Sequence, residues 1–366
     1  MIKVCFIHPY ALDAFKKRSV GGTELQIYHI SREIAKEEGM KAEVITNRDK
    51  SEKDFFEGVK LVKALGNVDT WPEKFITAFN MLYHMYESDA EVYFSSSDNM
   101  IPGLVSFYCL ITGSQHIHRT VHERQCDGSL IREDKIRGVV NNLGLRFSDF
   151  IFAQSQQHKN LLKDWFNPPV GVLPNLFPIA NEGNVSSSSN QEDHILWVGR
   201  RVRWKNPEMF IDLARRFKSQ KFVMISPCTG DDQEYYERID REAEKLDNLE
   251  LIERVPRTKI GKYYREAKIL VNTSEKEGFP NTFIEAGKAA TPILTYKVDP
   301  DNYIREENCG INCQGDAGKL FSSIDVLVND KDQIKTKGRN SRRYVEQNHD
   351  IEEEIHPLID KIENLT

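Results

Sequence analysis

Residues 274–286 read SEKEGFPNTFIEA and lie between an apolar run at 269–271 and a helical pattern. This order predicts a strand, a loop and the start of a helix, which is the repeating unit of an α/β fold. Gly278 allows a ligand to approach the backbone closely, and Pro280 suits the first turn of a helix. The stretch therefore predicts a binding loop at the end of a strand.

The start of this predicted helix is suited to an anion. Backbone amides without helical partners there point toward a negatively charged group, and a diphosphate fits the position; we expect them to be those of Asn281, Thr282 and Phe283. Glu285 lies about one turn into the helix, where its carboxylate could accept both hydroxyls of a ribose. Glu277 would then face the hydroxyls of a sugar. The alternative is a helix whose acidic residues only complement its dipole.

A second group of candidate residues follows the strand predicted at 195–198. Residues 198–207 read VGRRVRWKNP, so this strand ends in a cationic segment beside a new helix. Ligands of open α/β sheets bind at strand ends, and a nucleoside diphosphate leaving group needs fixed positive charge. We expect Arg200 and Lys205 to supply that charge. We expect Arg201 and Arg203 to be solvated surface residues.

Short apolar strands alternate with amphipathic helices along the whole chain, which predicts parallel sheets with crossover helices. The predicted strands are residues 2–7, 42–46, 91–95, 117–121, 150–153, 170–173, 195–198, 222–225, 249–252, 269–271 and 293–294. The predicted helices cover 22–36, 73–87, 131–147 and 156–165, and begin again near 206, 231, 258 and 281.

The length of 366 residues and the composition predict two domains. Residues 179–193 are rich in Asn, Ser and Gly and predict a linker. We therefore expect one α/β domain at 1–178 and a second α/β domain at 194–345. A charged C-terminal helix at 346–366 could pack locally or cross back to the first domain.

The first predicted domain contains two weaker candidates. Residues 20–24 read VGGTE and open a helix after the first strand, so the amides near Gly22 could meet a phosphate or an acceptor. A simple helix cap explains them equally well. His122 ends the strand predicted at 117–121 and could contact a donor sugar, whereas His116 and His118 alternate along the strand and are expected to be structural.

Composition excludes several classes of protein. The net charge of −6 argues against general nucleic-acid binding, and no apolar run approaches the length needed to span a bilayer. The N-terminus lacks the features of a signal peptide, which predicts a cytoplasmic protein. The six cysteines are scattered, which indicates idle thiols. Residues 16–18, Lys-Lys-Arg, leave open a weak peripheral contact with the inner face of a membrane.

Together these residues resemble a large family of retaining glycosyltransferases, glycosyl transferases group 1, which contains bacterial mannosyl- and glucosyltransferases. The resemblance covers nearly the whole chain. It rests on Gly21-Gly22-Thr23-Glu24, His122-Glu123, Pro174-Asn175, Gly199-Arg200 with Lys205-Asn206-Pro207, and Glu277-Gly278-Phe279-Pro280 with Glu285. The last group matches the E-x7-E signature of that family.

The resemblance implies the GT-B fold, in which two Rossmann-like domains face each other across a cleft. It implies that Arg200 and Lys205 hold the donor diphosphate, Glu277 the transferred sugar and Glu285 the ribose. The remaining implied donor contacts are His122, Gly22, the backbone at Val255 and Pro256, and the segment Gly278, Phe279, Pro280, Asn281 and Thr282. Two positions depart from the family pattern: Ala290, where glycine is common, and Glu123, where aspartate is frequent.

The resemblance also implies the reaction. A hexose would pass with retention of configuration from a nucleotide diphosphate sugar to a hydroxyl acceptor, in glycan, glycolipid or polysaccharide synthesis. A donor phosphate oxygen would take the acceptor proton, so neither a protein nucleophile nor a metal cofactor is expected. Glu277 as a covalent nucleophile ranks below this mechanism.

Four alternatives stay open. A metal-dependent transferase would need a motif such as Asp299-Pro300-Asp301 or Asp330-Lys331-Asp332, although solvated carboxylates in turns explain both triplets. A nucleotide-sugar epimerase would bind the same donor without an acceptor. A non-catalytic binding subunit would not cleave the donor. A nicotinamide dehydrogenase lacks support, because residues 20–24 are not a dinucleotide fingerprint.

Overall fold

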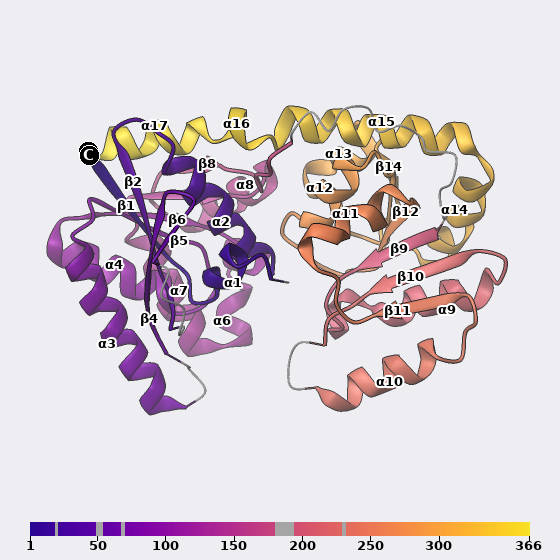
Figure 1. Ribbon diagram of the computed structural model, residues 1–366, viewed down its shortest axis with the longest axis horizontal. Helices are drawn as coiled ribbons and strands as arrows, with labels where there is room; N and C mark the ends of the chain where they lie inside the picture. The colour runs from indigo at the N-terminus through magenta and orange to yellow at the C-terminus, as the bar shows by residue number, and fades with distance from the viewer. Residues whose placement is uncertain (19–20, 49–53, 67–69, 180–193, 229–231) are drawn as a thin grey trace. The chain divides into compact units, whose positions relative to one another are not determined.

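The computed structural model describes residues 1–18, 21–48, 54–66, 70–179, 194–228 and 232–366. The chain divides into two compact units, coloured along the sequence in Figure 1. Unit 1 comprises Met1–Pro178 and Asp350–Thr366, and unit 2 comprises Ile179–His349. The linker expected at 179–193 lies outside the described residues except for Ile179.

Unit 1 is built on an eight-stranded sheet. Its strands are β1 (Ile2–Ile7), β2 (Met40–Asn47), β3 (Phe55–Phe56), β4 (Val59–Leu65), β5 (Val92–Ser95), β6 (Gln115–Arg119), β7 (Phe150–Ala153) and β8 (Val170–Val172). They are ordered β3-β4-β2-β1-β5-β6-β7-β8 and pair in parallel, apart from the antiparallel edge pair β3–β4. The chain therefore runs outward from β1 in one direction and from β5 in the other.

Helices cover both faces of this sheet (Figure 1). They are α1 (Ala11–Phe15), α2 (Gly22–Ile34), α3 (Trp71–Ser88), α4 (Ile101–Thr112), α5 (Glu123–Cys126), α6 (Ser129–Glu133), α7 (Lys135–Arg146), α8 (Gln156–Trp165), α16 (Ile351–Glu354) and α17 (His356–Leu365).

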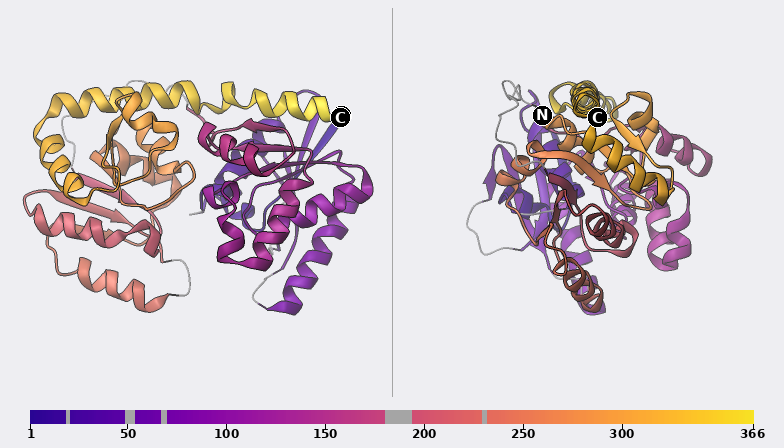
Figure 2. Two further views of the ribbon diagram at one scale, coloured as in Figure 1. Left: turned by 180° about the vertical axis from the view of Figure 1, so that it is seen from behind. Right: turned by 90° about the vertical axis from the view of Figure 1, so that its right-hand side faces the viewer.

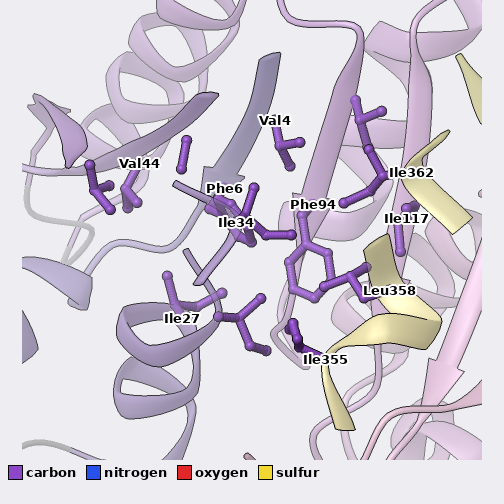
Figure 3. Close-up of a cluster of buried hydrophobic side chains, with 14 of the residues drawn as sticks. Val4, Phe6, Ile27, Ile34, Val44, Phe94, Ile117, Ile355, Leu358 and Ile362 are labelled. Atoms are coloured by element: carbon purple, nitrogen blue, oxygen red, sulfur yellow. The ribbon is translucent and has the colours of Figure 1, made fainter. Parts of the chain in front are cut away.

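The C-terminal helix belongs to the core of unit 1. Ile355, Leu358 and Ile362 are buried and pack with Val4 and Phe6 of β1, as Figure 3 shows. The backbone amide of Ile351 donates to the carbonyl of Phe177 at 3.0 Å, which fixes the entry of this segment. Burial of several large apolar side chains, each worth about 1.5–3 kcal/mol, makes α17 an integral layer rather than a tail.

The opposite face of the unit 1 sheet packs against α3 and α4. Buried residues of these helices, Met81, Met85 and Val105, form a second cluster with Cys5 and Tyr93 of the sheet. The hydroxyl of Tyr93 donates to the carbonyl of Met85 at 2.6 Å. Helices α3 and α4 thus lie in the same layer on this face.

Unit 2 is built on a six-stranded parallel sheet. Its strands are β9 (His194–Val198), β10 (Lys221–Ile225), β11 (Leu249–Ile252), β12 (Ala267–Asn272), β13 (Ile293–Thr295) and β14 (Gly310–Asn312), in the order β11-β10-β9-β12-β13-β14. Its helices are η1 (Arg203–Lys205), α9 (Pro207–Arg216), α10 (Gln233–Ala243), α11 (Arg257–Arg265), α12 (Asn281–Lys288), η2 (Pro300–Asn302), α13 (Tyr303–Glu306), α14 (Ala317–Asn329) and α15 (Lys331–Asn348).

These sheets confirm the predicted fold class, two Rossmann-like α/β units built on parallel sheets. The helix expected at 131–147 is in fact broken, because the Asp134 side chain caps α7 by accepting the amide of Arg137 at 3.1 Å. Every helix in the described ranges is too short or too polar to cross a membrane.

Candidate functional site

In unit 2 the candidate residues lie where the strand order reverses. The chain passes from β9 outward to β10 and β11, then returns to β12 on the other side of β9. The carboxyl ends of β9 and β12 are therefore neighbours, and loops that leave them in opposite directions form a ligand crevice in open α/β sheets. Lys205 follows β9 and Glu277 follows β12.

Hydrogen bonds hold these two loops together. The indole of buried Trp197 donates to the Thr273 hydroxyl at 2.9 Å, and that hydroxyl donates to the carbonyl of Lys205 at 2.6 Å. The amide of Glu275 donates to the carbonyl of Trp204 at 2.8 Å. These bonds join the backbones of the β9 and β12 loops, which is the kind of preorganisation that a binding site needs.

Lys205 and Glu277 form an ion pair between the Lys205 Nζ and the Glu277 Oε1. The side chains are only 14% and 11% exposed, respectively. The Ser274 hydroxyl donates to the same carboxylate oxygen at 2.8 Å. A cation and a carboxylate therefore meet in a largely desolvated position, where their interaction is stronger than on an open surface.

Other residues of the β9 loop pack against the Lys205 side chain and restrict its position. A Cβ atom on Gly199 would lie 3.1 Å from the Lys205 Cδ and 3.0 Å from the Trp197 ring, so a larger residue would crowd the lysine. The Lys205 Nζ lies 4.8 Å from the Trp204 ring centroid, and the Arg200 Cζ lies 5.9 Å from it. Both expected diphosphate cations therefore lie within cation–π distance of the Trp204 ring.

The expectation that Arg201 is a solvated residue is wrong. Its side chain is 4% exposed, donates from Nε and Nη2 to the carbonyl of Ser226 at 3.2 and 3.0 Å, and pairs with Asp240. It therefore secures the loop after β10. Arg203 is 69% exposed, as expected, and pairs with Asp232 at 3.0 Å.

The loop after β12 enters α12 at Pro280, which is its N-cap. One expectation fails here, because the amide of Phe283 donates to the carbonyl of Pro280 at 3.0 Å and does not point outward. The anion contacts expected at Asn281 and Thr282 stay predictions. Both residues are partly exposed, as is Gly278.

Phe279 has a structural role in the loop, because its side chain is buried. Its side chain is 6% exposed and stacks on Tyr303 with ring centroids 5.5 Å apart, and it lies 4.5 Å from the His349 ring. Tyr303 in turn stacks on Tyr344 of α15 at 4.2 Å. Phe279 thus anchors the loop in an aromatic cluster, which leaves only its backbone for a donor.

Glu285 of α12 pairs with Arg257, the first residue of α11. The Arg257 Nη2 donates to the Glu285 Oε1 at 2.5 Å, and the carboxylate is 13% exposed. Val255 is buried and Pro256 is exposed, directly before α11. Arg257 directly follows Pro256 in the sequence and contacts Glu285. The residues expected to hold the ribose and the base therefore lie near each other in unit 2.

The helix α12 ends at the position that departs from the family pattern. Ala290 has a φ of 54°, and the amides of Ala290 and Thr291 donate to the carbonyls of Gly287 and Ala286 at 2.9 and 2.8 Å. This is a Schellman motif, whose left-handed position favours glycine. Ala290 thus occupies a strained conformation in the position where glycine is common.

In unit 1 the Gly21-Gly22 pair opens α2, with Gly21 as its N-cap. A Cβ on Gly21 would lie 2.5 Å from the Glu24 Oε2, so the Glu24 carboxylate folds back toward the helix start. Glu24 also acts on His8, whose pKa is lowered by burial and raised less by Glu24. An acidic side chain already occupies this helix start, which supports the simple-cap interpretation of Gly22.

His122 does not end a strand as expected, because β6 stops at Arg119. His122 is instead the N-cap of α5, and its Nδ1 accepts the amide of Arg124 at 3.3 Å. The Arg124 guanidinium binds Asp98, with Nε at 2.9 Å, and also Glu133. Two ion pairs to Asp98, from Arg124 and Arg137, lower the pKa of its carboxyl although burial opposes the shift.

His116 and His118 are buried, and both bond to the Ser95 hydroxyl at 2.8 Å. Burial and the neighbouring Arg119 lower the pKa of His118 to about 3. Arg119 is fully buried and donates to the carbonyl of Leu173 and the Oδ1 of Asn175, and burial lowers its pKa to about 9. These residues are structural, and Arg119 holds the Pro174-Asn175 segment.

The acidic triplets have protein partners. Contrary to expectation, the Asp299 carboxylate is not solvated: it is 3% exposed and accepts the amide of Ile304, the Arg305 Nε and the Asn312 amide at 2.9, 3.0 and 3.2 Å. Asp330 caps α15 by accepting the amide of Gln333 at 2.9 Å. In the described part of the chain no cluster of three metal-ligating side chains occurs.

Sequence reasoning missed three residues of the unit 2 site. Arg257 was missed because its pairing with Glu285 depends on the approach of α11 to α12. Ser274 and Trp204 were missed because a hydroxyl and an aromatic ring lack a spacing signature, although both lie inside the quoted segments. The only signal in the sequence for Ser274 and Trp204 was their position close to Glu277 and Lys205.

Two parallel-sheet units, each with a strand-order reversal, together with the residues that follow β9 and β12, define a protein of the GT-B fold. Residues 180–344 match the family described as "Glycosyl transferases group 1", which confirms the predicted resemblance. The chain is therefore similar to that family over these residues.

The similar proteins agree with this assignment. The amylovoran biosynthesis glycosyltransferase AmsD of Erwinia amylovora is 27% identical over 181 residues, which cover 47% of this chain and 50% of AmsD. The chain thus matches about half the length of this relative. Sucrose-phosphate synthase of Thermosynechococcus elongatus has a TM-score of 0.80 at 16% identity, covering 100% of this chain and 99% of that one. HepE of Anabaena, solved with UDP-glucose, has a TM-score of 0.79 at 15% identity and full coverage of both chains.

Proposed function

We propose that this protein is a retaining glycosyltransferase that moves a hexose from a nucleotide diphosphate sugar to a hydroxyl acceptor in glycan, glycolipid or polysaccharide synthesis. The observation that carries the proposal is the placement of Glu277 and Glu285 around the start of α12, with each carboxylate bound to a cation. The family match and the similarity to a polysaccharide glycosyltransferase support the same activity.

In this proposal the donor spans the unit 2 site. Arg200, Lys205 and the first turn of α12 bind the diphosphate, because fixed cations and helix amides stabilise a departing anion. Glu285 accepts the ribose hydroxyls, and the backbone at Val255 and Pro256 lies beside the base. Glu277 orients the transferred hexose.

The chemistry then needs positioning more than a reactive side chain. A donor phosphate oxygen takes the acceptor proton as the acceptor oxygen attacks the anomeric carbon on the face that the leaving group departs. The C1–O bond to the diphosphate breaks, and the nucleoside diphosphate leaves with that proton. The protein contributes orientation and electrostatic stabilisation, and the reaction proceeds without a metal ion.

Thermal stabilisation by UDP, GDP, ADP and dTDP, each with and without a chelator, tests the donor site because a ligand stabilises the state that it binds. One nucleotide should stabilise the protein regardless of chelator, and Lys205→Ala and Glu285→Ala should lose that stabilisation. Arg203→Ala is the matched control, because it removes an exposed cation from the same loop. No stabilisation by any nucleotide, or strict metal dependence, would refute the proposed site.

Product analysis separates transfer from the alternatives. The nucleotide that stabilises the protein is supplied as its hexose conjugates with a panel of hydroxyl acceptors, and the configuration of the new bond is determined by NMR. Formation of a retained glycoside supports the proposal. An epimerised donor, an inverted glycoside, or a donor that is bound but never cleaved contradicts it.

A further inference from the structure

Four aromatic rings pack together behind the loop that follows β12. We call residues 277–280 the donor loop and the rings of Phe279, Tyr303, Tyr344 and His349 the aromatic cluster. The His349 ring is nearest to that of Phe279, with centroids 4.5 Å apart against 5.5 Å for Tyr303. It also lies 5.6 Å from the ring of Tyr344 on α15, and the His349 side chain is 1% exposed. His349 is therefore packed between the donor loop and α15.

His349 is also the residue at which the chain leaves unit 2. It is the C-cap of α15, and its backbone amide donates to the carbonyl of Val345 at 3.0 Å. The next residue, Asp350, is the first of the segment that belongs to unit 1, and Figure 2 shows this part of the chain in yellow as α15 leads into α16 and α17. A single peptide bond thus separates a side chain packed on the donor loop from the returning segment.

The residues after His349 are fixed within unit 1 by backbone hydrogen bonds. Asp350 forms a parallel bridge with Phe177, and the amide of Ile351 donates to the Phe177 carbonyl at 3.0 Å. The amide of Glu354 donates to the carbonyl of Asp350 at 2.8 Å, and Ile351 is buried in the core of unit 1. Phe177 lies two residues before the point at which the chain first enters unit 2. Both covalent connections between the units thus begin at one short paired stretch.

The body of α15 is braced against α12, the helix that begins directly after the donor loop. The two helices pack at backbone distance, because a Cβ on Gly287 would lie 2.9 Å from the Ser341 carbonyl oxygen. We therefore expect movement at the crossing to occur in residues 349–351 rather than within α15. Such movement would pull the His349 ring away from Phe279.

This packing couples the donor loop to the crossing. Aromatic rings attract each other in tilted or offset arrangements at about 4.5–7 Å, and the rings of Phe279 and His349 are inclined at 57°. A ligand that binds the donor loop favours the loop conformation in which Phe279 is packed, so it disfavours any opening that separates the two rings. Coupling free energies are reciprocal, so order at the crossing in turn favours ligand binding.

A purely structural role for His349 is the alternative. In that case the ring only fills the interior of unit 2, and it stabilises the unit equally with and without a ligand. The two roles differ in one measurable quantity, which is the dependence of backbone opening at residues 349–354 on a ligand bound to the donor loop.

We propose that His349 relays occupancy of the donor loop to the segment that returns the chain to unit 1. It acts through Phe279 and is therefore a positioning residue. When a nucleoside diphosphate occupies the donor loop, the two rings stay packed and the bond from Ile351 to Phe177 opens less often. The inference rests on the donor site of the proposed function and extends it to residues that do not contact the donor.

Hydrogen exchange of the full chain, measured by mass spectrometry, tests the relay. UDP, GDP, ADP and dTDP are each added at a concentration that saturates the protein in calorimetric titration, so that occupancy is matched between variants. In the wild type the nucleotide that binds should slow exchange at residues 349–354 about fivefold or more, the lower end of typical coupling. Exchange in α4, which packs on the opposite face of the unit 1 sheet from α17, should not change.

Two variants remove the ring contact and one restores it. His349→Ala and Phe279→Ala should each lose the nucleotide-dependent slowing while nucleotide is bound, and either one is sufficient if the other does not fold. His349→Phe keeps an aromatic ring at the crossing and should behave as the wild type does. His194→Ala is the matched control, because His194 is a buried histidine of unit 2 at the first residue of β9, 2% exposed, and it should keep the slowing.

The outcomes separate the relay from the donor site. Nucleotide binding without slower exchange at residues 349–354 in the wild type overturns the relay and leaves the donor site intact. The relay is also wrong if His349→Ala keeps the slowing, if His349→Phe does not regain it, or if His194→Ala loses it. Absence of nucleotide binding by the wild type would refute the donor site, and the relay with it.

Discussion

Lys205→Met tests the ion pair at the centre of the candidate site. The substitution keeps an unbranched side chain against Gly199 but removes the cation from the Glu277 carboxylate, which is 11% exposed and still accepts the Ser274 hydroxyl at 2.8 Å. Removing one member of a fully buried pair costs about 3–5 kcal/mol. Because some water reaches both side chains, we expect a loss of about 2–3 kcal/mol, or about 5–10 °C in melting temperature.

A double-mutant cycle measures the pair itself. Glu277→Gln removes the carboxylate charge while retaining a group that can bond to Ser274, so Lys205→Met/Glu277→Gln has neither charge. Its stability should return to within about 1 kcal/mol of the wild type, with a coupling energy of about 2 kcal/mol. Transfer activity should not return, because the diphosphate has lost its cation.

Differential scanning calorimetry of the four proteins, together with calorimetric titration of the stabilising nucleotide, provides the two readouts. Arg203→Met is the matched control, since Arg203 is exposed and should change neither quantity by more than about 0.5 kcal/mol. Equal stability of Lys205→Met and the wild type would refute the argument about the pair. Unchanged nucleotide affinity would refute the assignment of Lys205 to the diphosphate.

Three further outcomes are expected. Glu285→Gln should weaken nucleotide binding about 10–100-fold and abolish discrimination between a ribonucleotide and its 2′-deoxy form, as titration would show; retained discrimination contradicts the ribose role. His118 stays neutral in the folded state down to its pKa of about 3, whereas it protonates below 6.5 when unfolded, so unfolding takes up a proton and stability falls as pH falls through this window. The free energy of unfolding should therefore fall by about 2 kcal/mol between pH 7 and pH 5 because of His118. In urea titrations of His118→Asn this fall should be smaller by about 2 kcal/mol than in the wild type, and an equal fall in both proteins contradicts the shift. Ala290→Gly should raise stability by about 1 kcal/mol by relieving the φ of 54°, while Ala289→Gly, at the preceding C-cap with a φ of −88°, should not; a lower melting temperature of Ala290→Gly contradicts the strain.

The sequence was sufficient to predict what depends on short-range pattern. The strands around 195–198 and 269–271 were predictable because buried parallel strands are short apolar runs bounded by turns. The edge pair β3–β4 and helix α4 were not predicted. Residues 59–65 read VKLVKAL, and the three-residue spacing of Lys60 and Lys63 does not distinguish a strand from an exposed helix. Helix α4 contains Pro102 and Gly103, which the close packing against α7 tolerates.

In the candidate site, too, local sequence pattern predicted some residues, whereas others depend on tertiary contacts. Arg200, Lys205, Glu277 and Glu285 were identified from loops that follow strands, and the structure brings Lys205 to Glu277 because β9 and β12 are neighbours. The burial of Arg201 could not be predicted from its own segment, since its partners Ser226 and Asp240 come from the next strand and helix. Which arginines of this loop are buried and which are exposed depends on contacts with neighbouring strands and helices, and the sequence of the loop does not contain that information.

Both carboxylates of the site are paired with a cation, and the Lys205–Glu277 pair affects which ligand binds more tightly. A diphosphate competes with Glu277 for Lys205, so a nucleotide that draws Lys205 away leaves a nearly buried carboxylate without its cation. Hydroxyl groups of a hexose can donate to that carboxylate and offset the loss, whereas a bare nucleoside diphosphate cannot. The sugar conjugate should therefore bind more tightly than the nucleotide released after transfer, which favours product release, and Glu277→Gln should remove this difference because no charge is left to compensate.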